Sequence, residues 1–116
     1  MKLLAVGAVG VDQGSDTLFS DFESGGDMWT GTGKRERRKS VAFSAPFAAV
    51  PTVQVAISMI DMDHCHNHRI DLSAAAITQT GFEIVFRTWG DTRVARVRVN
   101  WLAIGPVASD DNWIVG

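Results

Sequence analysis

Two segments of strict alternation between apolar and polar residues, 81–88 and 93–105, constrain the fold of this 116-residue chain most strongly. In the first segment, Phe82, Ile84 and Phe86 fall on one face. The corresponding apolar positions of the second segment are Ala95, Val97, Val99, Trp101 and Ala103. Successive side chains of a β-strand point to opposite faces of the sheet, so each segment is predicted to be a strand with one buried face.

The residues between these two strands form the predicted turn of a hairpin. They are Trp89, Gly90, Asp91 and Thr92. Glycine and aspartate favour tight turns, and loop tips held by a rigid sheet often carry binding residues. The turn is therefore a candidate binding site, with the aromatic ring of Trp89 presented outward.

The rest of the chain is divided by further turn signals into short segments rich in Val, Ile, Phe and Thr, which is typical of an all-β sandwich. One of these segments places Val53, Val55, Ile57 and Met59 on its predicted inward face. Its outward residues are Thr52, Gln54, Ala56 and Ser58. They are small and uncharged, whereas a solvent-facing strand usually carries charge, so we expect this face to meet another subunit.

Composition and charge narrow the possible classes of protein. The length suits one domain, and no apolar run approaches the roughly 18 residues of a membrane-spanning helix. The net charge of −2 gives no general attraction to nucleic acid. The basic run from Lys34 to Lys39 is expected to be a solvated turn and strand edge rather than a nucleic-acid patch. One cysteine, Cys65, excludes an internal disulfide.

Several motifs in order resemble the H-type lectin domain family, which includes the snail agglutinins and the C-terminal half of the slime-mould discoidins. The matching segments are Val41-Ala42-Phe43-Ser44-Ala45-Pro46-Phe47, the strand that starts at Pro51 and reaches Ile57-Ser58 and Asp61, Asn67-His68-Arg69, Thr88-Trp89-Gly90-Asp91-Thr92, and Trp101-Leu102-Ala103-Ile104-Gly105. The resemblance implies a compact six-stranded antiparallel β-sandwich over residues 22–105. It also favours a strand over a helix at 70–77. Residues 1–21 would be an N-terminal arm or extra strand, and 106–116 a tail.

The resemblance also implies a sugar site that contains Trp89 and Arg69. A flat indole ring can pack on a pyranose, and a guanidinium offers several donors to hydroxyl groups. From the residues alone, Trp89 could equally be a rim aromatic, and Arg69 could form an ion pair with Asp61, Asp63 or Asp71.

The sequence also departs from the family at this site. Gly90 stands where the best-known snail lectin has a sugar-contacting histidine, and Ala95 stands where it has an aromatic residue. Asp27 or Thr32 could fill the place of the family's loop acid. The fold is therefore expected to carry over, but the N-acetylgalactosamine specificity is not. We predict ligand contacts from Arg69, Trp89, Gly90, Asp91, His68 and Asp27.

Residues 61–68 contain three histidines, one cysteine and two aspartates, all of which can ligate metals. Structural zinc sites normally draw ligands from two separated elements, so we expect no metal and no other cofactor here. The histidines of this loop, His68 among them, would instead bond the ligand or line the threefold axis that the family's trimers have.

No motif of an enzyme active site stands out in the sequence. The pattern predicts a non-catalytic carbohydrate-binding domain that acts as a multivalent homotrimer in cell-surface recognition or adhesion, with galactose-like sugars as candidates. The alternative is a structural or receptor-binding module of a phage-like particle, such as a tail fibre. Either function places the protein outside the cell or on a particle surface. Residues 1–10 resemble a secretion signal only weakly, because their apolar part is short.

Overall fold

The computed structural model describes residues 1, 3 and 7–108. Its elements are β1 (Val9–Phe19), α1 (Asp21–Ser24), α2 (Asp27–Thr30), β2 (Arg35–Ala42), β3 (Thr52–Met62), β4 (Ile70–Ala75), β5 (Gly81–Thr88) and β6 (Val94–Pro106). Part of the weak signal-like segment and most of the predicted tail, residues 2, 4–6 and 109–116, lie outside the described residues. No helix within the described residues is long and apolar enough to cross a membrane.

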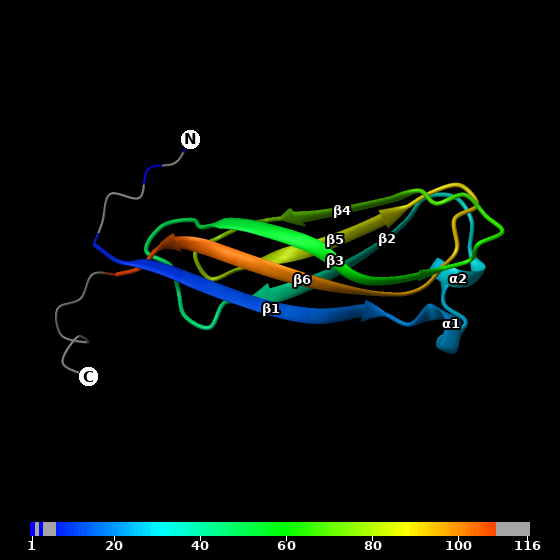
Figure 1. Ribbon diagram of the computed structural model, residues 1–116, viewed down its shortest axis with the longest axis horizontal. Helices are drawn as coiled ribbons and strands as arrows, with labels where there is room; N and C mark the ends of the chain where they lie inside the picture. Colours follow the sequence, from blue (N-terminus) through cyan, green and yellow to red (C-terminus); the bar gives the residue numbers. More distant parts are fainter. Residues whose placement is uncertain (2, 4–6, 109–116) are drawn as a thin grey trace.

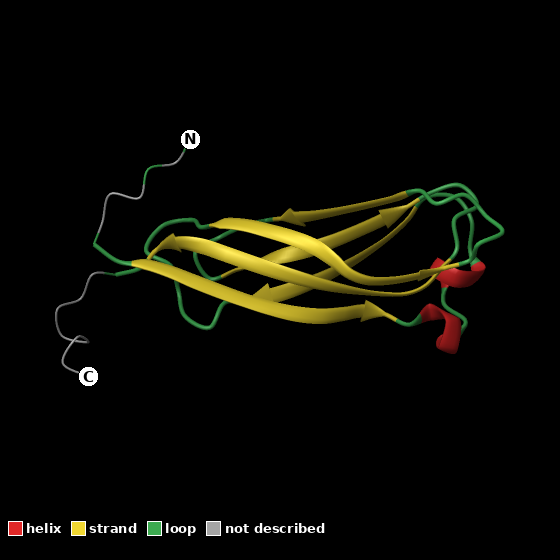
Figure 2. Ribbon diagram, viewed as in Figure 1, coloured by secondary structure: helices red, strands yellow, loops and turns green. Residues whose placement is uncertain are grey.

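The six strands form two antiparallel sheets that pack face to face. One sheet has the order β1-β6-β3 and the other has the order β2-β5-β4 (Figures 1 and 2). The architecture confirms the predicted six-stranded β-sandwich. The strand β1 lies before residue 22 and pairs with β6 from Val9, opposite Pro106, to Phe19, opposite Val97.

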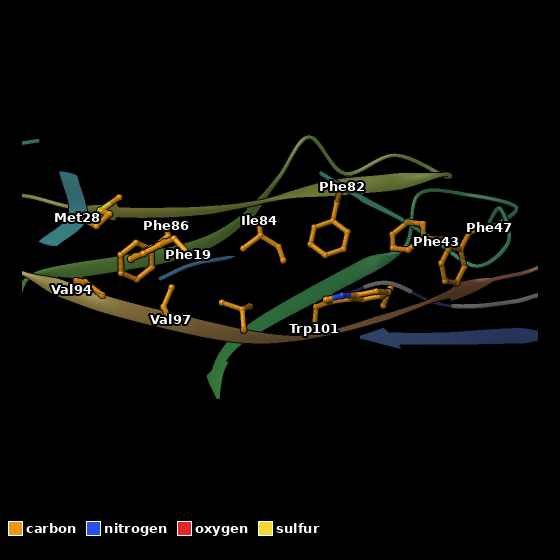
Figure 3. Close-up of a cluster of buried hydrophobic side chains, with 12 residues drawn as sticks. Phe19, Met28, Phe43, Phe47, Phe82, Ile84, Phe86, Val94, Val97 and Trp101 are labelled. Atoms are coloured by element: carbon orange, nitrogen blue, oxygen red, sulfur yellow. The ribbon is translucent and has the colours of Figure 1, made fainter. Parts of the chain in front are cut away.

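The core lies between the sheets and consists of the faces that alternation predicted. Phe82, Ile84 and Phe86 of β5 are buried, and so are the inward residues of β6 (Figure 3). The ring of Phe82 lies 5.4 Å from that of Trp101, in an edge-to-face contact that joins the two sheets. Aromatic pairs at this spacing add stability beyond the area they bury.

The prediction for one inward residue is wrong, because Met59 does not join the core. The register between β3 and β6 shifts between Ile57 and Met59, which pairs Met59 with the exposed Arg98. A bulge inserts one residue and moves every later side chain to the opposite face. Strict alternation would point Ile60 outward, but because of the bulge Ile60 packs against the core.

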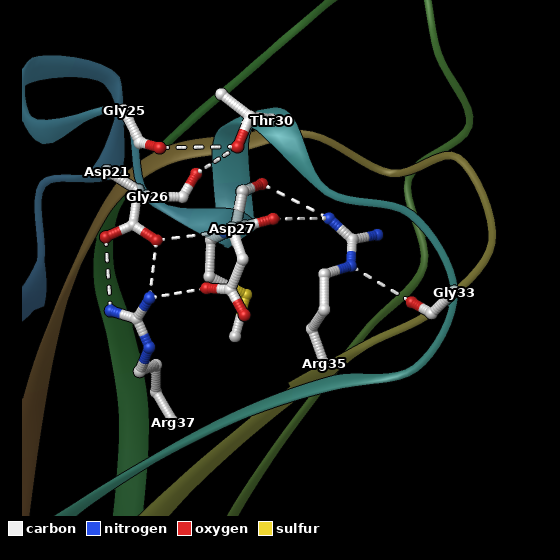
Figure 4. A network of polar contacts seen from close by, with 9 residues as sticks. Asp21, Gly25, Gly26, Asp27, Thr30, Gly33, Arg35 and Arg37 are labelled. Carbon is white, nitrogen blue, oxygen red and sulfur yellow. Dashed lines mark hydrogen bonds and ion pairs between the residues drawn. The ribbon is translucent and has the colours of Figure 1, made fainter.

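Two single-turn helices, α1 and α2, build a corner between β1 and β2. The Asp21 carboxylate is 3% exposed and accepts hydrogen bonds from the Met28 amide and from Arg37 (Figure 4). A Cβ atom on Gly26 would overlap the Asp21 carboxylate, so the close approach requires glycine. Helices of four residues are too short to show a periodic pattern in sequence.

Candidate functional site

Three loops meet at the end of the sandwich that carries α2 (Figure 1). They are residues 31–34 before β2, residues 63–69 before β4, and residues 89–93 between β5 and β6. The amide of Gly33 donates to the carbonyl of Gly90 over 2.9 Å, and the amide of Arg69 donates to Thr92 Oγ1 over 3.0 Å. These bonds join segments that are far apart in the sequence, and we call this end of the molecule the tip.

Arg69 and Asp91 meet at the tip beside Gly90. Gly90 has a φ of +69°, a left-handed conformation that favours glycine. A Cβ atom there would lie 3.6 Å from Arg69 Nη1, so the guanidinium rests against the bare backbone. Arg69 Nη1 is 3.5 Å from Asp91 Oδ1, and both side chains are half-exposed. A donor and an acceptor therefore stand side by side within reach of solvent.

Two buried threonines, Thr88 and Thr92, fix the position of Arg69. Thr92 Oγ1 donates to the Asn67 carbonyl over 2.7 Å while it accepts from the Arg69 amide. Thr88 Oγ1 donates to the Arg69 carbonyl over 2.6 Å. Buried hydroxyl groups need such partners, and these partners tie the start of β4 to the turn. In the sequence, Thr92 stands within the predicted turn and Thr88 directly before it, but the pattern marks neither hydroxyl as buried.

The carboxylate of Asp91 stays ionised at the tip. Partial desolvation opposes ionisation, but the hydrogen bond from Asn67 Nδ2, backbone hydrogen bonds and the nearby His66 outweigh it. The pKa of Asp91 therefore lies below its usual value. An ionised carboxylate only accepts hydrogen bonds, so Asp91 complements the donors of Arg69.

Trp89 is 41% exposed and lines a groove on the outer face of the β2-β5-β4 sheet. The groove has a volume of about 720 Å³ and is lined by Lys34, Arg35, Glu36, Ile70, Asp71, Arg87, Thr88 and Trp89. Asp91 instead lines a hollow of about 270 Å³ with Thr30, Gly31, Thr32, His66 and Arg93. We expected Trp89 and Arg69 to share one groove, but Arg69 lines neither depression and lies against Gly90, the residue after Trp89.

Asp27 is not brought into contact with the Arg69–Asp91 pair. Its carboxylate bonds Arg37 Nη2 over 2.6 Å, in the corner network with Asp21 (Figure 4). Its backbone carbonyl accepts from Arg35 Nη1, which links the corner to the tip. Thr32, the other candidate for the loop acid, lines the hollow that contains Asp91.

The histidine-rich loop is organised around Asp63. Its carboxylate accepts from the Cys65 amide over 2.9 Å and lies 3.0 Å from His66 Nδ1, while His68 Nε2 is 3.1 Å from the Asp63 carbonyl. The amide of Cys65 is the main reason why the pKa of Asp63 lies below its usual value; desolvation opposes that shift, and His66 and Arg93 support it. His68 therefore faces its own loop.

One possible metal-ligand group lies within the described residues: Asp63, His64 and Cys65, whose ligand atoms are all within 4.8 Å of one another. The Asp63 carboxylate is already engaged, and the side chain of His64 is 94% exposed. Three consecutive residues in one loop do not supply the four ligands from two elements that structural zinc sites have.

We therefore expect the purified protein to contain no stoichiometric zinc. Metal analysis of protein prepared without an affinity tag or chelator measures this. One zinc per chain that disappears in His64→Ala or in His66→Ala would contradict the prediction.

The sequence of this chain is similar to that of a known family and of several known proteins. The H-type lectin domain model matches residues 38–104. The chain is 59% identical over 112 residues to a protein called ATP synthase subunits region ORF 7 from Fuscovulum blasticum, with 96% of this chain and 97% of that protein covered. It is 37% identical over 75 residues to a Discoidin-1 polypeptide of Dictyostelium discoideum, which covers 64% of this chain and 30% of that protein.

Solved structures agree on the fold. Discoidin II of Dictyostelium discoideum superposes with a TM-score of 0.74 at 23% identity, over 90% of this chain and 40% of that one. A tailspike protein of a Pseudomonas phage has a TM-score of 0.52 at 16% identity, over 87% of this chain and 15% of that one. The chain thus spans less than half of these larger proteins. With the match over residues 38–104 and the observed sandwich, the chain belongs to the H-type lectin domain family.

Proposed function

We propose that this protein is a non-catalytic carbohydrate-binding domain whose sugar site lies at the tip. Membership of a lectin domain family supports a carbohydrate-binding role. The observation that carries the location is the pairing of Arg69 with an ionised Asp91 beside the exposed ring of Trp89. Sugar hydroxyls both donate and accept hydrogen bonds, and the C–H face of a pyranose packs on an aromatic ring.

Gly90 shapes the specificity of the proposed site. The residue has no side chain and stands where the best-known snail lectin has a histidine, so the space beside Arg69 is open. A wider site accepts a larger or differently substituted sugar. Galactose and N-acetylgalactosamine are suitable first probes, because they test directly whether the altered residue changes the preference.

Trp89→Ala is expected to weaken sugar binding by about 1–3 kcal/mol while leaving the melting temperature nearly unchanged, because a half-exposed rim residue contributes little to folding. Arg69→Ala is expected to weaken the same binding through the loss of its donors. A glycan array on the parent protein identifies the ligand, and calorimetric titration of the two variants measures the loss.

Lys39→Ala is the control, since Lys39 is an exposed cation of β2 that forms an ion pair with Asp16 and lines neither the groove nor the hollow at the tip. It should bind like the parent. Unchanged binding in both Trp89→Ala and Arg69→Ala would place the sugar site elsewhere. A collapsed melting temperature for Trp89→Ala would show that the ring belongs to the core.

We further propose that the domain acts as a homotrimer. The outward residues Thr52, Gln54, Ala56 and Ser58 of β3 are exposed and uncharged, which suits contact with another copy of the chain. Single sugar sites are shallow and weak, and linking several in one particle raises avidity without new contacts. In this family the sugar sites lie at subunit junctions, so His68 and the neighbouring loop are candidates for contact with ligand or partner.

Sedimentation at micromolar concentration is expected to give about three times the monomer mass of 12.6 kDa. Ala56→Glu places a charge in the proposed interface and should shift the protein toward monomer, while Glu23→Gln in the exposed corner should not. A parent protein that sediments as a clean monomer would refute both the trimer and a junction site.

The proposed setting is glycan recognition or adhesion at a cell surface, with the protein outside the cell. The second candidate is a structural or receptor-binding module on a phage-like particle. It is favoured by one observation: a tailspike protein contains a segment of the same fold. Its sequence identity to this chain is 16%, so the likeness concerns the fold alone. A glycan array with no bound sugar would favour the particle module over the lectin.

A further inference from the structure

The groove that contains Trp89 has the size of a ligand site and lies beside the tip. Its volume of about 720 Å³ is within the range of roughly 300–1,000 Å³ that small-molecule sites occupy. Its lining includes Glu36, Arg87 and Asp71, which are exposed and lie opposite one another on β2, β5 and β4, so it opens on the outer face of this sheet, and Trp89 also lines it. Of the residues proposed to contact the sugar at the tip, Trp89 lines this groove but Arg69 and Asp91 do not, so the part of the groove beyond the ring is unassigned.

A positive charge without a carboxylate partner lies beneath this groove. Arg35 is 7% exposed, and the hydrogen bonds that its guanidinium donates to described residues all go to backbone carbonyls (Figure 4). The acceptors are the carbonyls of Gly33 at 3.0 Å, Asp27 at 3.2 Å, Gly90 at 3.2 Å and Met28 at 3.4 Å. Among residues 1, 3 and 7–108, no carboxylate lies within ion-pair distance of it. Neutral acceptors satisfy its hydrogen bonds but do not cancel its charge.

A second uncompensated cation stands next to it. Lys34 is exposed, lines the groove and makes no hydrogen bond or ion pair with any residue that the structure describes. An ammonium group on a flexible stem can reach a ligand without first leaving another partner.

The two carboxylates of the groove are engaged by other arginines. Glu36 is bonded by Arg38 over 2.8 Å and by Arg87 over 2.7 Å, and these bonds hold the pKa of Glu36 below its usual value. Asp71 lies 3.7 Å from the other side of the Arg87 guanidinium. The negative charges of the groove are thus balanced, while the positive charges of Lys34 and Arg35 are not.

We infer that this groove binds an acidic sugar residue, with the ring of the sugar on Trp89 and its negative group directed at Lys34. The chemistry required is a pyranose that carries a carboxylate or a sulfate. The inference rests on the proposed carbohydrate-binding function and adds a subsite to it. Trp89 lies between the tip and the groove. A glycan that passes over it would contact the Arg69–Asp91 pair at the tip with one sugar residue and the positively charged groove with the next.

The probe is an oligosaccharide of alternating uronic acid and N-acetylhexosamine residues, titrated in parallel with its carboxyl-reduced form. The parent protein is expected to bind the acidic form more tightly, with a preference that shrinks as salt is added. Lys34→Glu should weaken binding of the acidic form about tenfold, because it replaces attraction by repulsion. It should leave binding of the reduced form within about twofold, because Lys34 has no other partner among the described residues.

Lys39→Glu is the control, since it makes the same charge change in the same basic run but outside the groove; because it also places two like charges together at Asp16, its melting temperature is measured alongside. Its expected effect on the acidic probe is within about twofold. Equal binding of the acidic and reduced probes by the parent would overturn the inference, and so would equal losses in Lys34→Glu and Lys39→Glu. A sulfated oligosaccharide whose binding depends on Lys34 would support the inference and identify sulfate as the anion.

The same experiment separates this inference from the proposed tip site. A parent protein that binds the acidic and the reduced probe equally, but whose binding of neutral sugar depends on Arg69, would contradict the groove subsite and support the tip site. If Arg69→Ala leaves neutral sugar binding unchanged while the preference for the acidic probe still depends on Lys34, the sugar site at the tip is contradicted and the groove subsite is supported.

Discussion

Arg35→Met is expected to lower the free energy of unfolding by about 2–4 kcal/mol, because it removes four hydrogen bonds that a buried guanidinium donates to backbone carbonyls. The Arg35 guanidinium bonds the carbonyls of Asp27, Met28, Gly33 and Gly90. These carbonyls belong to α2, to the loop before β2 and to the turn after β5. Methionine fills a similar space along the stem but cannot donate. Chemical denaturation of the parent and the variant measures the difference.

The same change is expected to weaken sugar binding, because the Gly90 carbonyl loses its bond to Arg35 and the turn beside Arg69 is held less firmly. Faster hydrogen exchange of the amides in residues 89–93 would report this loosening. Arg38→Met is the matched control on the same strand: Arg38 is half-exposed, and its ion pairs with described residues are those with Glu36 and Glu83 at the surface. Exposed ion pairs contribute about 0–1 kcal/mol, so equal losses in the two variants would contradict the role assigned to Arg35.

Phe86→Ala is expected to cost about 3–5 kcal/mol of unfolding free energy. Phe86 is fully buried in the central strand of the β2-β5-β4 sheet, and its ring contacts Phe19 at 5.5 Å. Its side chain lies in the cluster between the sheets (Figure 3), so the substitution leaves a cavity there. The denaturant midpoint should fall while the slope of the transition stays the same.

Phe22→Ala is the comparison for this prediction. Phe22 is largely exposed and contacts Trp29 in the corner formed by α1 and α2. The loss should be about 1 kcal/mol, as for an aromatic contact at the surface. A Phe86→Ala variant as stable as Phe22→Ala would show that the space between the sheets closes without cost.

The sequence alone determined the sandwich and its main inward faces. Alternation is a direct consequence of strand geometry, so Phe82, Ile84 and Phe86 could be assigned to the core without a structure, as could Val97 and Trp101. The order of motifs was enough to identify the family, because each motif marks a strand or turn that the fold requires. These features depend on residues close together in the chain.

Tertiary structure alone decided which charged residues are buried and which loops meet. Arg35 lies in a basic run that was expected to be solvated, yet it is buried, while Lys34 beside it is exposed. The difference arises from carbonyl groups of α2 and of the turn after β5, which no local pattern reveals. The bulge that turns Met59 outward is likewise fixed by pairing with β6. The local alternation of residues predicts the strand conformation of the backbone, whereas contacts between distant segments determine the partner of each polar side chain.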